Sequence, residues 1–172
     1  MPEYDFTKYF ENIFGIEFNA KAVREFRRMK FNQSKFCYFL VAIQEIFNYK
    51  EVTLKMNGVE SDFFEIVIGN GKREGGLFKI SKQPNPLTDN SLDLTVIRSA
   101  SKIKRIFYIL TATLGMLQNC KEVEYKKITD IELETKDNLL THIDGSLLFL
   151  PPGKIKVSVV PKALKVIQPA VI

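Results

Sequence analysis

The chain has 172 residues, of which 45% are hydrophobic, and a formal net charge of +5. This length and composition predict one domain over residues 1–172 with a substantial core, and they exclude a disordered protein. The charge is spread along the chain without interleaved aromatic residues, which argues against a nucleic-acid partner. No apolar run approaches the roughly 20 residues of a spanning helix, and the acidic residues 1–5 lack the order of a signal peptide. We therefore expect a cytoplasmic protein.

Cysteine and histidine usage limits the metal chemistry that the chain can support. Cys37 and Cys120 both lie inside apolar helical patterns, and the chain has one histidine. Buried thiols in a reducing compartment explain the cysteines better than a disulfide does. One histidine and two distant cysteines also exclude a four-ligand zinc site.

The first predicted helix covers residues 20–32, with Asn19 as a plausible N-cap. It carries a narrow apolar stripe and a strongly basic remainder. The cations are Arg24, Arg27, Arg28 and Lys30. Such a helix suits an anionic membrane surface, although a solvated face is the commoner explanation.

The second predicted helix runs from Lys35 to Asn48 after a capping Ser34, and apolar residues nearly encircle it. A helix of this kind is either buried or lies against a lipid-sized pocket. A third helix is predicted over 101–118, with Ser101 as its cap and one apolar face.

Most of the remaining chain shows the two-residue period of strands. Residues 52–56 alternate, Asn57-Gly58 supplies a type I′ turn, and residues 60–68 form the return strand. Further strands are predicted at 77–81, 92–98, 122–128, 130–135, 138–143, 146–150, 154–160 and 163–168. The element order indicates an α+β fold, a largely antiparallel two-sheet sandwich or curled sheet with about three helices.

Asp144-Gly145 separates two apolar runs and predicts a second type I′ hairpin. His142 lies just before this turn. A general acid or base is conceivable there, but a lone histidine on a strand is more often structural.

Two loops carry weaker signals. Gly69-Asn70-Gly71 follows an apolar strand, as in a phosphate-binding loop, but no complete phosphate-loop motif is present and the glycines can simply shape a hairpin. The turn-rich segment 84–93 could offer oxygen ligands to Mg²⁺ or Ca²⁺. From the sequence alone, a solvated turn is the better explanation.

Taken in order, these motifs resemble the C-terminal domain of the bacterial diacylglycerol kinase-like lipid kinases, relatives of sphingosine and ceramide kinases. The resemblance covers about residues 10–169. Its motifs are Asn12-Ile13-Phe14-Gly15-Ile16-Glu17-Phe18-Asn19-Ala20, the helix at 36–49, Gly69-Asn70-Gly71 with Gly75-Gly76, the segment Pro84 to Leu94, His142-Ile143-Asp144-Gly145, and Val160 to Val166.

The resemblance implies a β-rich lipid-substrate domain that works with a separate ATP-binding domain. Together they would transfer a phosphoryl group from ATP to the hydroxyl of a diacylglycerol-like lipid. The Gly-Gly-Asp-Gly-Thr loop that positions ATP belongs to the N-terminal domain and is missing here, so this chain is expected to be inactive by itself. ATP would therefore bind only when that kinase domain is present as a partner.

The resemblance also assigns site residues and exposes departures from the family. Asp144 and Ser146 occupy the catalytic turn, but the family has a glutamate base where Ser146 stands, and a hydroxyl does not act as a general base near neutral pH. A structural Mg²⁺ would be held by Asp89 and by backbone oxygens at Pro86 and Ser91. Asn90 replaces a glycine of that turn, and Asn tolerates positive φ.

Three further expectations complete the hypothesis. The helix at 35–48 and adjoining strands would form the acyl-chain pocket, and the protein could associate peripherally with a membrane. Leu164, Val166, Ile167 and Val171 would lose cover in an isolated domain, which predicts self-association. The main rival is a non-catalytic lipid-binding or regulatory protein derived from the same family.

Overall fold

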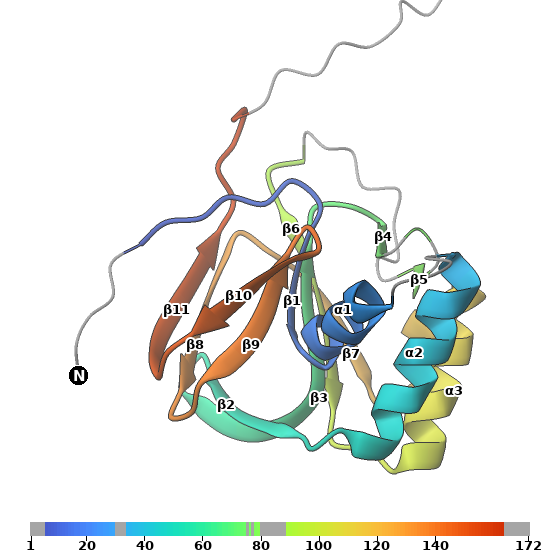
Figure 1. Ribbon diagram of the computed structural model, residues 1–172. Coiled ribbons are helices and arrows are strands. Elements are labelled where there is room, and N and C mark those ends of the chain that lie inside the picture. The colour runs from blue at the N-terminus through green and yellow to red at the C-terminus, as the bar shows by residue number, and fades with distance from the viewer. Residues whose placement is uncertain (1–5, 30–33, 75, 77, 80–88, 164–172) are drawn as a thin grey trace, which may run out of the picture.

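The computed structural model describes residues 6–29, 34–74, 76, 78–79 and 89–163. Within them, three helices cover one face of a curled antiparallel sheet (Figure 1). The helices are α1 (Phe18–Arg28), α2 (Lys35–Asn48) and α3 (Lys102–Thr113), and a short 3₁₀ turn, η1 (Leu117–Asn119), follows α3. The α+β prediction is confirmed.

Nine strands of the described chain pair into the main sheet, and β3 (Val59–Gly69) is its centre. The other members are β1 (Ile13–Glu17), β2 (Val52–Met56), β6 (Leu92–Arg98), β7 (Val123–Ile128), β8 (Asp130–Thr135), β9 (Leu139–Ile143), β10 (Ser146–Leu150) and β11 (Gly153–Ser158). A separate small ladder joins β4 (Arg73–Glu74) to β5 (Phe78–Lys79).

The sheet branches at β3 because this strand is long enough to serve two neighbours on one edge. Its first half pairs with β2 and its second half with β1, while β6 runs along the opposite edge. One arm therefore continues as β1-β9-β10 and the other as β2-β8-β11. The two arms curl toward each other and enclose one core, which includes Phe14, Phe63 and Leu133.

A second core lies on the other face, between the sheet and the helices. It includes Phe18, Ile46, Phe64 and Ile109. Phe64 stacks against Phe18 with ring centroids 4.4 Å apart, and the Arg105 guanidinium lies 4.9 Å from the Phe64 ring centroid. Helices α1 and α3 thus both contact the Phe64 ring of β3.

The boundaries differ from prediction where local signals conflict with packing. Strand β1 was missed because all five of its residues are buried, so no alternation marks it. The prediction of Asn19 as N-cap is wrong. Helix α1 begins at Phe18, so Asn19 lies inside it, and the Asn19 side chain donates to Glu74. Helix α3 ends at Thr113, ahead of Gly115 with its φ of 72°.

Other expectations are confirmed or fall outside the description. The side chains of Ser34 and Ser101 accept the predicted N-cap hydrogen bonds. Most of the predicted strand at 163–168, and the apolar residues proposed for self-association, lie outside the described residues. Across the described helices, none combines the length and hydropathy needed to cross a bilayer.

Candidate functional site

The Asp144-Gly145 turn holds residues 11–13, where β1 begins, against the β9–β10 hairpin. Both residues have positive φ, 48° and 79°, as a type I′ turn requires. The Asp144 carboxylate accepts backbone N–H bonds from Glu11 at 2.8 Å, Asn12 at 3.0 Å and Ile13 at 2.7 Å. Asp144 therefore has a clear structural task, and its predicted catalytic role stays a prediction.

His142 connects this turn to the interior. Its side chain is 2% exposed, and its ring lies against Gly15, where an added Cβ would come within 2.3 Å of Nε2. Nδ1 accepts the Gly145 N–H at 3.2 Å, so the ring proton sits on Nε2, which donates to Glu74 Oε1 at 3.0 Å. The glycine of the first motif is needed because the imidazole occupies the space beside it.

Glu74 collects three donors from three separate elements. Besides His142 on β9, the amide of Asn19 on α1 donates at 2.6 Å, and the hydroxyl of Tyr38 on α2 donates over a longer 3.5 Å. The Glu74 side chain is buried, and these three hydrogen bonds satisfy its carboxyl oxygens. Burial, and secondarily the Glu74 charge, raises the pKa of the Tyr38 hydroxyl well above its usual value, which keeps Tyr38 a donor.

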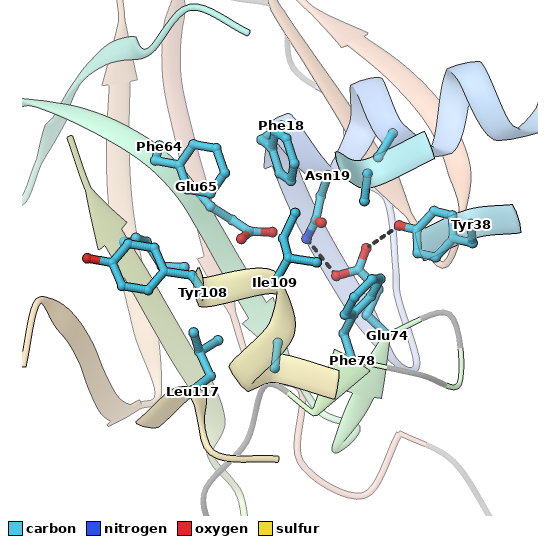
Figure 2. Close-up of a pocket in the computed structure, with 14 residues that line it drawn as sticks. Phe18, Asn19, Tyr38, Phe64, Glu65, Glu74, Phe78, Tyr108, Ile109 and Leu117 are labelled. Carbon is cyan, nitrogen blue, oxygen red and sulfur yellow. Dashed lines mark hydrogen bonds between the residues drawn. The ribbon is translucent and has the colours of Figure 1, made fainter. Parts of the chain in front are cut away.

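These residues form the polar end of a largely apolar pocket between the helices and β3. The cavity that these residues enclose has a volume of about 30 Å³, far smaller than an acyl chain. Figure 2 shows Asn19 and Tyr38 converging on Glu74, with Phe78 beside it. The remaining wall is apolar and consists mainly of Phe18, Ala22, Ala42, Phe64, Ile97, Ile109, Ala112 and Leu117.

A β-bulge directs a second carboxyl group into this pocket. The register between β3 and β6 shifts between Phe63 and Glu65, so Phe64 and Glu65 both lie on the helix side of the sheet. In Figure 2 the Glu65 carboxyl group points toward Asn19. Burial, followed by the charge of Glu74, raises the pKa of Glu65 well above its usual value. The pocket lining thus contains two carboxyl groups, Glu65 and Glu74.

The second glycine motif packs directly on the first. The backbone N–H groups of Asn70 and Gly71 both donate to the Asn12 carbonyl, at 2.8 and 3.1 Å. A Cβ at Gly71 would come within 1.8 Å of the Asn12 side-chain oxygen. The Gly69-Asn70-Gly71 loop therefore closes against the chain that enters β1.

Glu17 has a backbone conformation that favours glycine, with φ 59° and ψ −90°. Its buried side chain compensates for this strain. Oε1 accepts the Leu140 N–H at 2.7 Å, and Oε2 pairs with Lys21 at 2.7 Å. The carboxylate continues the β1–β9 ladder at the point where the backbone turns into α1.

The predicted Mg²⁺ turn keeps the expected backbone. Asn90 has a φ of 54°, and Asp89 Oδ1 accepts the Ser91 N–H at 3.0 Å. However, Asp89 Oδ2 forms an ion pair with Lys127. Burial alone would raise the pKa of Asp89, but the Lys127 ammonium and the Ser91 donors hold it below its usual value.

These contacts do not by themselves fit a divalent ion. Pro86 lies outside the described residues, and the described part of the chain contains no group of three His, Cys, Asp or Glu side chains that could hold a metal. A cation beside Asp89 would have to share that carboxylate with Lys127. The Mg²⁺ site stays a prediction.

Ser146 and Arg27 flank the exposed side of the Asp-Gly turn. Ser146 is exposed on the first position of β10. The Arg27 guanidinium, from the end of α1, reaches to 4.0 Å from the position of a Cβ on Gly145. The turn thus presents a hydroxyl and a cation near one another, a combination suited to an anionic group.

Sequence comparison assigns the family. Residues 13–168 match the model of the YegS C-terminal NAD kinase beta sandwich-like domain. The chain belongs to this family. No curated protein gives a significant match.

Solved structures agree with the YegS C-terminal fold. A putative diacylglycerol kinase from Bacillus anthracis str. Sterne aligns with a TM-score of 0.58 and 23% identity, covering 87% of this chain and 50% of that one. A second structure of that description, from the same organism, gives a TM-score of 0.58 at 24% identity with the same coverage. A further diacylglycerol kinase structure from this organism gives 0.51 and 18%, covering 87% and 47%. The chain spans about half the length of these proteins.

The sequence did not predict that the polar residues of the pocket lie together; these are Asn19, Tyr38, Glu65 and Glu74. One signal was available for Glu65, because it is the single charge within the apolar run from Phe63 to Ile68. No local signal predicts that Glu74 is buried, because the segment Lys72-Arg73-Glu74 is typical of a charged surface loop. Its burial depends on contacts with Asn19, Tyr38 and His142, which are distant in sequence.

Proposed function

We propose that this YegS C-terminal domain is the lipid-substrate domain of a diacylglycerol kinase-like lipid kinase. With a nucleotide-binding partner domain and ATP, it would support phosphoryl transfer to a lipid hydroxyl. The observation that carries the proposal is the position of His142. Its two ring nitrogens join the Asp144-Gly145 turn to the polar end of the apolar pocket. A lipid tail needs a dry apolar wall and a few oriented polar groups. The residues around the pocket offer both, and α2 and α3 would have to move apart to admit an acyl chain.

The residues suggest a division of labour. Apolar side chains around Ala112 and Phe64 would contact an acyl chain. Glu65, whose pKa burial raises, and Glu74 would hydrogen-bond hydroxyl groups at the polar end. Arg27, beside Gly145, would attract the anionic phosphoryl donor toward the turn. The chemistry of ATP itself is assigned to the partner domain.

A second candidate is a non-catalytic lipid-binding or regulatory protein of the same family. Ser146 favours it, because this exposed hydroxyl stands where the family resemblance places a glutamate base. The same pocket would then bind lipid without turnover.

One experiment separates these candidates. The chain is mixed with a cognate N-terminal domain, and ATP-dependent phosphorylation of diacylglycerol is measured in detergent micelles. Turnover that rises strongly in Ser146→Glu supports the kinase domain. Lipid binding without turnover in either form supports the regulatory protein, and absence of lipid binding contradicts both.

A matched pair of variants tests the pocket itself. Ala112→Phe adds a ring inside the pocket, while Thr113→Phe adds the same ring one residue further, outside its lining. We expect Ala112→Phe to abolish binding of a fluorescent diacylglycerol and Thr113→Phe to retain it. Circular dichroism of both variants establishes that the fold is kept.

The proposed Mg²⁺ at Asp89 has its own measurement. Melting curves in Mg²⁺ and in EDTA should differ for the wild type and coincide for Asp89→Asn if the ion binds. Identical wild-type curves would indicate that Lys127 alone neutralises Asp89.

A further inference from the structure

The outer surface of α2 and α3 carries a large apolar face that the fold leaves exposed. On α3, Ile103, Phe107, Leu110 and Leu114 recur at helical spacing, opposite the buried Arg105, Tyr108, Ile109 and Ala112. Ile103 is 81% exposed and Leu114 72%. We call the exposed set the α2–α3 ridge: Phe36, Leu40, Phe47, Ile103, Phe107, Leu110, Leu114 and Met116.

The stripes of the two helices meet where α2 ends and α3 begins. The Lys102 ammonium at the start of α3 donates to the Phe47 carbonyl at 3.1 Å and lies 5.8 Å from the Phe47 ring centroid. Figure 1 shows α2 and α3 side by side at the edge of the molecule that faces away from the curled sheet. Scattered exposed apolar residues are ordinary in proteins, but exposed apolar stripes on two adjacent helices mark an interaction surface.

The charges around the ridge point to an anionic occupant. Glu45 is the only acid in α2 or α3. The charges that act on its pKa are those of Glu25, Arg24 and Lys21, which all belong to α1. Lys102 marks one end of the ridge. Lys35 begins α2 at the other end, where the Lys79 side chain lies against Gly115, 3.0 Å from the position of an added Cβ.

We propose that the α2–α3 ridge docks on an anionic lipid bilayer. A helix that lies in the membrane interface buries one apolar face in the headgroup region and keeps basic residues at the rim, and each cation near an anionic surface adds to binding. The α1 cations named from sequence fit less well, because Arg24 and Arg28 both pair with Glu25.

The position of the ridge links docking to the proposed lipid pocket, and this part rests on the proposed function. Tyr38, Ala42, Ile109 and Ala112 line the pocket from the inner faces of α2 and α3. The ridge is the outer face of the same two helices. Docking would therefore bring the pocket within one helix diameter of the bilayer from which a lipid substrate must be drawn.

Vesicle co-sedimentation of the full chain tests the proposal. We compare phosphatidylcholine vesicles with vesicles containing about 30% phosphatidylglycerol, and we expect binding only to the anionic vesicles, weakened by salt. Phe107→Ser with Leu114→Ser removes two ridge side chains, and Lys102→Glu reverses a rim charge. Val59→Ser with Phe149→Ser is the matched control, because these residues are equally exposed but lie on the sheet, at 67% and 68%.

We expect binding to fall about tenfold or more in the ridge variant, less in the charge variant, and not at all in the control. Three results would overturn the proposal: no wild-type binding to anionic vesicles, equal binding by the ridge variant, or a wild-type dimer whose ridge variant is monomeric while neither binds vesicles. The micelle assay of phosphorylation does not require docking. Failure of the ridge proposal is therefore distinguishable from failure of the lipid-kinase proposal.

Discussion

The Asp144 carboxylate should be one of the most important polar groups for stability. Asp144→Ala removes the acceptor for three backbone N–H groups, at Glu11, Asn12 and Ile13. Hydrogen bonds to a charged acceptor contribute about 1.5–3 kcal/mol each, and because two of these three are exposed we take about 1 kcal/mol for each bond. The free energy of unfolding should therefore fall by about 3 kcal/mol, which corresponds to a melting temperature lower by roughly 6–12 °C.

Urea unfolding followed by circular dichroism measures this loss, with Ser146→Ala as the control in the same turn. Ser146 is exposed, so its substitution should change stability by less than about 0.5 kcal/mol. Asp144→Asn should fall between the two, because one amide oxygen still accepts while the NH₂ group faces a donor. If the free energy of unfolding of Asp144→Ala remained within about 1 kcal/mol of the wild-type value, the three hydrogen bonds to the carboxylate would not stabilise the fold.

Three further predictions follow from close contacts and from charge. Gly15→Ala places a methyl group 2.3 Å from His142 Nε2 and should cost about 2–3 kcal/mol in a urea titration; an unchanged midpoint would refute the contact. Glu65 has a pKa raised above the ordinary 4.5, so the folded state binds its proton more tightly than the unfolded state does. Its contribution to stability is therefore complete below about pH 4.5 and is lost as pH rises through the folded pKa. Melting temperatures across pH should show this decline in the wild type and less of it in Glu65→Gln; parallel curves would contradict the assignment. At Glu17, with φ 59°, Ala keeps the strain without the hydrogen bonds, so Glu17→Ala should be less stable than Glu17→Gly by about 1 kcal/mol, and the reverse order would exclude backbone strain.

Features that depend on neighbouring residues could be predicted from the sequence. The Asn57-Gly58 and Asp144-Gly145 turns both have the predicted positive φ, and Ser34 and Ser101 cap the predicted helices. In each case a side chain or a backbone conformation is determined within four residues. Such signals are visible without knowledge of the fold.

Features set by distant residues could not be predicted in the same way. Strand β1 has no alternation because it is covered on both faces, and only its pairing with β3 and β9 makes it a strand. The orientation of Glu65 depends on a bulge that leaves no local mark. Asn19 carries the composition of a cap, but the buried Glu74 carboxylate takes its amide instead.

The pairing of β1 with β9 connects early and late parts of the chain, and it determines when the domain can fold. Strand β1 pairs with β9, joining Phe14 to Ile143, and the Asp144 bonds span 131–133 residues of sequence. Contacts of such separation slow folding because a long loop must close before they form. During synthesis, the β1-β9-β10 arm cannot assemble until nearly the whole described chain has left the ribosome. Strand β1 can pair with β3 earlier, but its other edge must wait unpaired until β9 is made, which makes this interval a period of aggregation risk.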